Sequence, residues 1–297
     1  MDAAQGILKP ESSNPHLLVC GHGYLGRAVS REFLAAGWHV TAVSRSDADH
    51  GSATPLLDER SADLASAESV AELAGSIAPP DFIVHCASSG RGGADSYRAV
   101  YLGGCRHLLA SFPGVPLLFT SSTSVYPQTD GSEVTEDSPA EPDRETGKLL
   151  REAEQTVLDG RGIVFRLSGI YGPERSVILK KFLSGEATLE EDGRRILNQI
   201  HRDDAAAAIF HAATQSVPSG IWNVSDSNPR SQLATFKALA KRFNRPMPPS
   251  APRDPNRKRG WTHKRVSNAK LVSAGWHLQH PDFLEAAGSV ADTLKIG

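Results

Sequence analysis

A glycine-rich turn, Gly21-His22-Gly23-Tyr24-Leu25-Gly26, constrains the fold of this chain more than any other feature. It directly follows the apolar run Leu17–Cys20 and directly precedes a helical pattern. In this setting the first glycine of G-x-G-x-x-G permits a tight turn, the second lets a pyrophosphate approach the backbone, and the third lets helix and strand pack closely. The sequence therefore predicts a dinucleotide site at the start of the helix, formed by Gly21, Gly23, Tyr24, Leu25 and Gly26.

Apolar strand candidates alternate with helical patterns through the first half of the chain. The expected strands are His16–Cys20, His39–Ser44, Asp81–Cys86, Val115–Ser121 and Gly162–Ser168. The expected helices are Leu25–Ala36, Ser66–Ile77, Ser96–Phe112 and Asp143–Leu158. Such alternation predicts an α/β protein of the Rossmann type, with a doubly wound parallel sheet covered by helices on both faces.

The rhythm changes after about Tyr171, where the elements become shorter and mixed. The pattern there predicts a strand at Gly220–Val224 and helices at Asp203–Thr214, Arg230–Phe243 and Asp282–Leu294. We therefore expect a flexible tail over residues 1–15, a dinucleotide-binding core over 16–172 and a smaller substrate-binding lobe over 173–297. Some strands and helices of this last part are expected to return to the core.

Composition excludes several classes of protein. The chain has 32 Lys plus Arg against 34 Asp plus Glu, a balance that argues against nucleic acid as the partner. Its apolar runs are far shorter than the roughly 18 residues of a membrane span, and its N-terminus lacks a secretory pattern. The 3 cysteines match no zinc motif. We expect a cytoplasmic protein with a small-molecule substrate, no metal and no membrane contact; a homodimer stays open.

The end of the second strand bears on which dinucleotide is bound. An NAD site usually has an acid there to accept from the ribose 2′-hydroxyl. Here the strand ends in Ser44-Arg45-Ser46, and a hydroxyl beside a guanidinium suits a 2′-phosphate. This favours NADP, with NAD as the alternative, although Arg45 is also compatible with a solvated loop. Asp63 is a candidate for contacting the adenine, or for capping the following helix.

Several segments resemble the extended short-chain dehydrogenases/reductases, the epimerase and dehydratase superfamily. Thr120–Pro127 is similar to its S-S-x-x-V-Y-G segment, Arg166–Pro173 to L-R-x-x-x-I-Y-G-P, and Asn198–Asp204 to N-x-I-H-V-D-D. The segment Val84–Ser88 resembles the strand beneath the cofactor, so the resemblance adds Ala87 and Ser88 to the cofactor site. It spans nearly the whole chain in the right order and implies an NAD(P)-dependent oxidoreductase, epimerase or dehydratase.

The resemblance also exposes a departure from the family. Members carry a Tyr-x-x-x-Lys pair on one helix face, in which the lysine holds the ribose and lowers the pKa of the tyrosine. Lys148 matches the lysine and Glu152 an acid one turn later, but the tyrosine position is Arg144. Arginine stays protonated and cannot replace a phenol as acid–base catalyst. Arg144 is instead a candidate clamp for an anionic substrate group.

Other residues are candidates for the missing catalytic and substrate-binding roles. Ser122 matches the hydroxyl that bonds the reacting oxygen in the family, although a strand-end serine also bonds its own backbone. Tyr126 is a candidate proton donor or a wall of the pocket. Tyr171 and Asn198, from two of the resembling segments, are candidates for facing the substrate.

Two functions from different classes follow. The first is an NADP-dependent oxidoreductase or epimerase acting on a sugar-like or other small hydroxyl or carbonyl compound, with Ser122, Tyr126 and Lys148 as catalytic residues. The second is a non-catalytic NADP-binding protein that senses redox state or serves as a scaffold, having lost the tyrosine. The retained cleft-forming segments favour the first.

Overall fold

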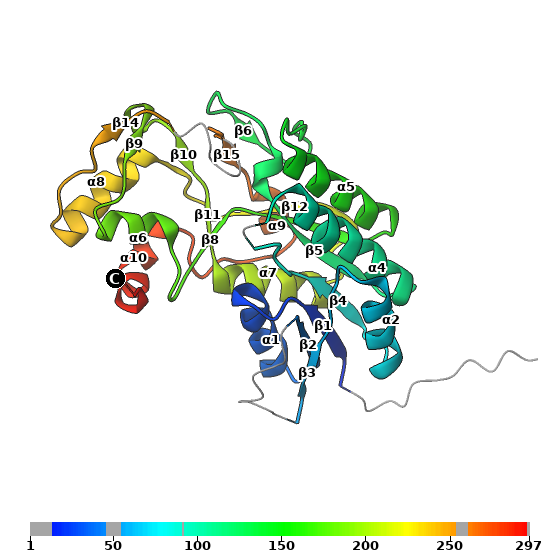
Figure 1. Cartoon of the computed structure of the whole chain (residues 1–297). Coiled ribbons are helices and arrows are strands. Elements are labelled where there is room, and N and C mark those ends of the chain that lie inside the picture. The colour runs from blue at the N-terminus through cyan, green and yellow to red at the C-terminus, as the bar shows by residue number, and fades with distance from the viewer. Residues whose placement is uncertain (1–13, 46–54, 91, 254–260, 296–297) are drawn as a thin grey trace, which may run out of the picture.

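A seven-stranded parallel sheet forms the centre of the molecule, in a computed structural model that describes residues 14–45, 55–90, 92–253 and 261–295. The strand order is β12-β7-β5-β4-β1-β2-β3, the doubly wound order that the sequence predicts (Figure 1). These strands are β1 (His16–Cys20), β2 (His39–Ser44), β3 (Leu57–Ser61), β4 (Phe82–His85), β5 (Leu117–Ser122), β7 (Ile163–Leu167) and β12 (Gly220–Val224). The predicted Rossmann-type α/β class is confirmed.

Helices cover both faces of this sheet (Figure 1). On one face α1 (Tyr24–Ala35) packs against α7 (Arg202–Thr214), and both bury apolar side chains such as Phe33 and Ile209 against the strands. On the other face lie α2 (Ala67–Ser76), α4 (Gly104–Ser111) and α5 (Glu145–Asp159). Helix α4 continues from α3 (Ala94–Tyr97) through a π-helical segment, Arg98–Gly103. Two apolar cores therefore sandwich the sheet.

A third apolar cluster forms the smaller lobe, seen at the left of Figure 1. It joins α6 (Val177–Leu183), α8 (Gln232–Phe243) and α10 (Phe283–Thr293), with Phe182 stacked on Phe236. The remaining helix is α9 (Ala269–Ser273). The short strands are β6 (Glu133–Val134), β8 (Gly169–Tyr171), β9 (Leu189–Glu190), β10 (Ile196–Leu197), β11 (Gln199–His201), β13 (Arg230–Ser231), β14 (Ser250–Ala251) and β15 (Arg265–Val266).

Differences from the sequence prediction concentrate in polar or short segments. Strand β3, with the sequence LDERS, pairs with β2 at the sheet edge and carries no apolar alternation that would reveal it. Two elements of the second half of the chain, β12 and α7, belong to the core layers, in keeping with the expectation that some of them return to the core. The expected tail falls largely on residues 1–13, outside the described residues.

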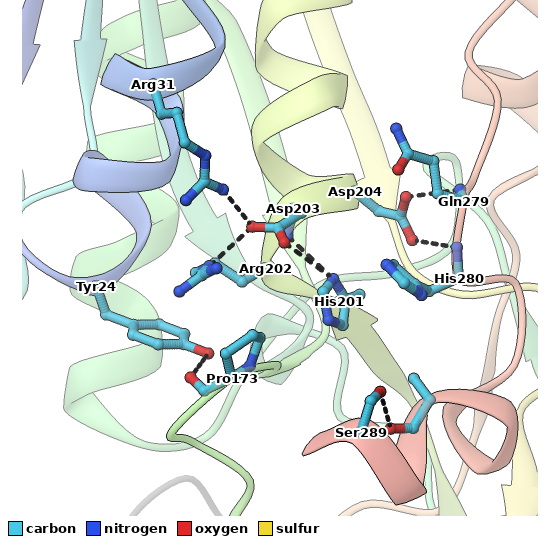
Figure 2. A network of polar contacts seen from close by, with 11 residues as sticks. Tyr24, Arg31, Pro173, His201, Arg202, Asp203, Asp204, Gln279, His280 and Ser289 are labelled. Atoms are coloured by element: carbon cyan, nitrogen blue, oxygen red, sulfur yellow. Dashed lines mark hydrogen bonds and ion pairs between the residues drawn. The ribbon is translucent and has the colours of Figure 1, made fainter. Parts of the chain in front are cut away.

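A network of polar contacts joins the core to the smaller lobe (Figure 2). The Asp203 carboxylate accepts from Arg31 of α1 at 2.8 Å and from Arg202 at 2.9 Å. The neighbouring Asp204 carboxylate accepts from the backbone N–H groups of Gln279 and His280, at 2.7 and 2.9 Å. The start of α7 thus holds both α1 and the segment that leads into α10.

His201 is the N-cap of α7 within this network. Its ring nitrogen Nδ1 accepts from the backbone N–H of Asp203 at 3.2 Å, so Nδ1 carries no proton and the imidazole is neutral. The ring also lies against that of His280, with 3.8 Å between centroids and 41° between the ring planes. Burial, together with the charge of His280, lowers the pKa of His201 to about 4.

This histidine should make folding stability sensitive to acid. Because the pKa of His201 is lower in the folded state, its neutral form contributes stability that is lost as pH falls from 6.5 toward about 4. We expect His201→Asn, which keeps an N-cap acceptor but cannot titrate, to flatten this loss by up to roughly 3 kcal/mol. Urea unfolding between pH 4 and pH 7 gives the free energy of unfolding of both proteins. Equal pH dependence of this free energy in the wild type and in His201→Asn would contradict the prediction.

Candidate functional site

A cavity of about 730 Å³ opens at the carboxyl ends of the central strands, where open α/β sheets bind ligands. Its volume falls within the roughly 300–1,000 Å³ of cofactor sites. The lining residues come from the ends of the central strands other than β12, from the helices beside them, and from β8 and the loop after it: Gly21, His22, Gly23, Tyr24, Leu25, Val43, Ser44, Arg45, Ala62, Leu64, Cys86, Ala87, Ser88, Tyr97, Tyr101, Thr120, Ser121, Ser122, Leu150, Leu167, Ser168, Ile170 and Arg175.

The three glycines of the turn serve different purposes. Gly21 has φ +109°, and a Cβ there would lie 2.3 Å from the backbone nitrogen of Ala87. A Cβ on Gly26 would lie 2.1 Å from the Gly21 carbonyl oxygen. A Cβ on Gly23, in contrast, would meet no atom within 4 Å. Packing therefore requires Gly21 and Gly26, whereas Gly23 keeps a space open on the cleft side, as a bound pyrophosphate needs.

The N-terminus of α1 faces this space and is suited to an anion. Gly23 is its N-cap, no side chain bonds the first N–H groups, and the first turn carries no acid. Unpaired N–H groups and the positive helix end attract phosphate oxygens. Tyr24 lines the cleft beside Leu25, and its hydroxyl donates to the Pro173 carbonyl at 2.9 Å (Figure 2).

Ser44 and Arg45 both line the cleft at the end of β2, and Arg45 is exposed. One acid lies nearby that the sequence reasoning missed, because β3 was not predicted. Glu59 of β3 pairs with His22, with 3.2 Å between Oε1 and Nδ1. His22 lines the cleft, whereas Glu59 does not.

Asp63 does not face the cleft, which corrects its candidacy as an adenine contact. The side chain is exposed, and its carboxylate accepts from the backbone N–H of Ala65 at 3.0 Å. The residues on either side, Ala62 and Leu64, line the cavity instead. Ser66 is the residue that caps α2. Asp63 therefore stabilises a turn before this helix.

Helix α5 presents a different face to the cleft than the motif comparison implied. Lys148 is exposed and does not line the cavity, whereas Leu150 does. Two residues set this orientation: the fully buried Glu154 carboxylate accepts from Ser121 at 2.5 Å and from Arg166 at 2.7 and 3.1 Å. A helix that directs Glu154 inward turns Leu150, one turn earlier, toward the cleft.

The family pattern therefore falls two residues later than the sequence comparison placed it. With Glu154 as the acid, Leu150 takes the lysine position and Thr146 the tyrosine position, each one helical turn apart. The expected ribose-binding and catalytic role of Lys148 is corrected, because its side chain is exposed and does not line the cleft. Both members of the Tyr-x-x-x-Lys pair are absent from α5, and not only the tyrosine.

Tyr126 lies in the core and cannot reach a substrate in the cleft. Its side chain is fully buried, its hydroxyl donates to Asn223 Oδ1 at 2.9 Å, and the Arg166 guanidinium lies 4.7 Å from the ring centroid. Burial raises the pKa of Tyr126, which makes proton loss harder. The structure speaks against the expected proton-donor role, and Tyr126 instead links the segment after β5 to β12, two strands away in the sheet.

Ser122 does line the cleft, at the end of β5. Its hydroxyl oxygen accepts from the backbone N–H of Ser124 at 3.2 Å, capping the short turn Thr123–Val125. An oxygen that accepts at one lone pair keeps its proton for a ligand. Ser122 can therefore bond its own backbone and also donate to a ligand in the cleft. Its catalytic role stays a prediction.

Tyr171 and Asn198 lie outside the cavity, which corrects their expected contact with substrate. Tyr171 is fully buried against Phe283 and His201, with ring centroids at 4.9 and 5.2 Å. Asn198 bonds two backbone groups, donating to the Lys264 carbonyl at 3.0 Å and accepting from the Val266 N–H at 2.8 Å. It fixes the segment around β15.

A second cavity of about 200 Å³ adjoins the first and shares Tyr97 and Leu150 with it. Arg144, just before α5, lines this second cavity together with Thr146 and Trp261. The structure thus puts the predicted anion clamp in a cavity that adjoins the cleft. Its substrate contact stays a prediction.

Two tyrosines at the cleft were not predicted as site residues. Tyr97 and Tyr101 line the cavity from the two helical segments that precede α4, and their rings meet edge to face at 4.9 Å. The Tyr101 hydroxyl accepts from the Ser89 backbone N–H at 3.2 Å. Their spacing of one helical turn was a usable signal, because residues four apart share a helix face.

Among the described residues no group of three or more His, Cys, Asp or Glu side chains could hold a metal ion. No helix in the same part of the chain is both long and apolar enough to cross a membrane.

The model of the NAD dependent epimerase/dehydratase family matches residues 17–225, the strands and helices that form the cleft. The chain belongs to this family. The family match also confirms the predicted resemblance to extended short-chain dehydrogenases/reductases. A comparison with curated protein sequences gave no match.

Solved structures of this family align over nearly the whole chain. A protein of Methylobacillus flagellatus, assigned as an NAD-dependent epimerase/dehydratase, is 28% identical with TM-score 0.77, covering 95% of this chain and 98% of that one. The UDP-glucose 4-epimerase of Thermus thermophilus, in complex with NAD, is 20% identical with TM-score 0.77, covering 94% and 98%. The Bordetella bronchiseptica enzyme WbmG, with NAD and UDP, is 17% identical with TM-score 0.79, covering 95% and 94%. The last two support the fold alone.

The space at Gly23 gives a direct test of the dinucleotide site. We expect Gly23→Val to abolish dinucleotide binding with little loss of stability, because its Cβ would meet no protein atom within 4 Å and its methyl groups would occupy the proposed phosphate position. Gly26→Ala is the matched control: its Cβ clashes with the Gly21 carbonyl, so it should destabilise the fold by about 2 kcal/mol or more. Calorimetric titration and thermal unfolding measure both, and unchanged affinity in Gly23→Val would place the phosphates elsewhere.

Proposed function

We propose that the chain binds NADP(H) in the large cleft, prefers it to NAD(H), and acts as an oxidoreductase or epimerase on a small hydroxyl or carbonyl compound. The observation that carries the proposal is the pairing of an open Gly23 position with Ser44 and Arg45 in one cavity. A guanidinium and a hydroxyl at the end of β2 match a 2′-phosphate, which a carboxylate in that position would repel.

The comparisons support the family and the nicotinamide dinucleotide at a coarser level. The structures from Thermus thermophilus and Bordetella bronchiseptica were solved with NAD. The preference for NADP is therefore a property we propose for this chain, on the basis of its own β2 end. When bound, the dinucleotide supplies a hydride donor or acceptor, its nicotinamide ring.

The second cavity is the proposed place for the substrate. It meets the cleft at Leu150 and Tyr97, and Ser124, two residues after Ser122, lines it. Arg144 there favours a substrate with an anionic group, because guanidinium groups bind carboxylates and phosphates with paired hydrogen bonds. In this proposal Ser122 donates a hydrogen bond to the reacting oxygen.

A second function has its own supporting observation. Leu150 and Thr146 replace the lysine and tyrosine that the family resemblance implies, so the cleft lacks the pair that binds the ribose and exchanges the proton. This favours a non-catalytic NADP-binding protein, a sensor or a scaffold. Binding of the dinucleotide is common to both proposals, and hydride transfer separates them.

The cofactor preference can be measured directly. Wild-type protein should bind NADPH at least roughly tenfold more tightly than NADH, and Arg45→Asp should erase or reverse the preference. Arg60→Asp is the control: Arg60 lies on the adjacent strand β3, paired with Asp58 at 2.8 Å, and does not line the cleft. Calorimetry with both dinucleotides gives the ratio. Equal wild-type affinities would contradict the preference.

Restoring the family pair tests which function applies. We expect Leu150→Lys to strengthen NADPH binding, because its amine would enter the cleft, whereas Lys148→Ala should leave binding unchanged. Adding Thr146→Tyr should raise or create NADPH oxidation, by the roughly 10²–10⁴-fold of a general acid. Absorbance assays over sugar nucleotides and small carbonyl compounds measure this.

The wild-type result of that assay divides the proposals. Turnover by the unmodified protein supports an enzyme with a proton donor outside α5. Activity only in the Thr146→Tyr/Leu150→Lys variant supports a binding protein whose site retains the family geometry. Inactivity of both proteins across the panel, with NADPH binding intact, contradicts the oxidoreductase proposal.

A further inference from the structure

Tyr24, the fourth residue of the glycine turn, has two arginines over its ring. The guanidinium carbons of Arg175 and Arg202 each lie 5.0 Å from the centroid of its ring. The Tyr24 hydroxyl donates to the Pro173 carbonyl, two residues before Arg175 (Figure 2). This contact links the start of α1 to the loop between β8 and α6.

The two arginines differ in what else they contact. Arg202 donates from Nε to Asp203 at 2.9 Å and does not line the cleft. Arg175 lines the cleft, and within the described part of the chain its guanidinium makes no ion pair or hydrogen bond. One guanidinium is neutralised by a carboxylate, and the other presents its charge at the cleft.

The loop that carries Arg175 is held firmly. Backbone hydrogen bonds join Gly172 and Arg175 in both directions, at 2.8 and 3.0 Å. The N–H of Glu174 donates to Thr293 Oγ1 of α10 at 2.7 Å. Gly172, with φ +152°, leaves room for the Tyr24 hydroxyl, which a Cβ would approach to 2.9 Å. The Arg175 guanidinium therefore lies over the Tyr24 ring, and the backbone that carries it is held by hydrogen bonds.

We propose that Arg175 binds the diphosphate of the dinucleotide, opposite the N-terminus of α1; this rests on the proposed dinucleotide site. Tyr24 and the N-terminus of α1 follow Gly23 directly, so the Arg175 guanidinium, which lies 5.0 Å from the Tyr24 ring centroid, is near the proposed phosphate position. A guanidinium binds phosphate oxygens with two parallel hydrogen bonds. Stacking on Tyr24 fixes it beforehand, which lowers the entropy lost on binding.

The contact also gives the smaller lobe a part in cofactor binding. Arg175 belongs to the loop that leads into α6, and Glu174 of that loop is tied to α10. A diphosphate held between Arg175 and the glycine turn therefore bridges the core and the smaller lobe.

The experiment compares Arg175→Gln with Arg202→Gln, two substitutions of arginines that lie at the same 5.0 Å distance from the Tyr24 ring centroid. NADPH and NADH are titrated into each full-length protein by calorimetry, with thermal unfolding as a check of the fold. We expect Arg175→Gln to weaken both dinucleotides by the same factor, roughly tenfold or more, because both carry the diphosphate. Arg202→Gln should change either affinity by less than about twofold, and added salt should weaken wild-type binding more than that of Arg175→Gln.

Each other outcome overturns the inference. Unchanged affinities in Arg175→Gln show that the guanidinium does not contact the cofactor. A loss confined to NADPH assigns Arg175 to the 2′-phosphate, and an equal loss in Arg202→Gln assigns the effect to the position of Tyr24. Failure of the wild-type protein to bind either dinucleotide instead overturns the proposed function, which separates it from failure of the Arg175 contact alone.

Discussion

The buried carboxylate of Glu154 determines how α5 lies on the sheet, and the character of the cleft depends on it. A charge inside an apolar core is tolerated only where it is paired and hydrogen-bonded. Here Ser121 of β5 and Arg166 of β7 meet that requirement, and Arg166 in turn lies over the ring of Tyr126. These contacts hold α5 to two neighbouring strands in one rotational setting. As a result Leu150 faces the cavity and Lys148 faces solvent.

The glycine turn imposes the second constraint, at the other end of the cleft. Gly21 and Gly26 let β1, α1 and the end of β4 approach more closely than any side chain would permit. This close approach leaves the N-terminus of α1 uncapped beside an open cavity. Tyr24 of the same turn joins it to the loop between β8 and α6 through the hydrogen bond to the Pro173 carbonyl. The fold and the phosphate site thus arise from one packing requirement.

The cleft combines two kinds of chemistry. Arg45, Arg175 and the N-terminus of α1 supply cationic groups, and Leu150, Leu167 and Ile170 supply apolar ones. The cationic groups suit the phosphates of the proposed dinucleotide. In the proposed reaction the proton transfer relies on hydroxyl groups such as Ser122 and the paired Tyr97 and Tyr101, because Leu150 and Thr146 of α5 provide neither phenol nor amine. Family membership accounts for the binding more directly than for the reaction.

Local sequence determined the strands β1, β2 and β12 with their observed bounds, and the dinucleotide turn, because apolar runs and glycine spacing act over a few neighbouring residues. It also determined the parallel sheet, since strand–helix alternation permits few topologies. It did not determine which of several candidate side chains reach the cleft. Tyr126 and Tyr171 match family segments yet are fully buried, and the motif on α5 matched equally well in a register two residues away. Only tertiary contacts decide which side chains reach the cleft, because the rotation of a helix about its axis is fixed by the partners of its buried residues. For α5 these partners are Ser121 on β5 and Arg166 on β7.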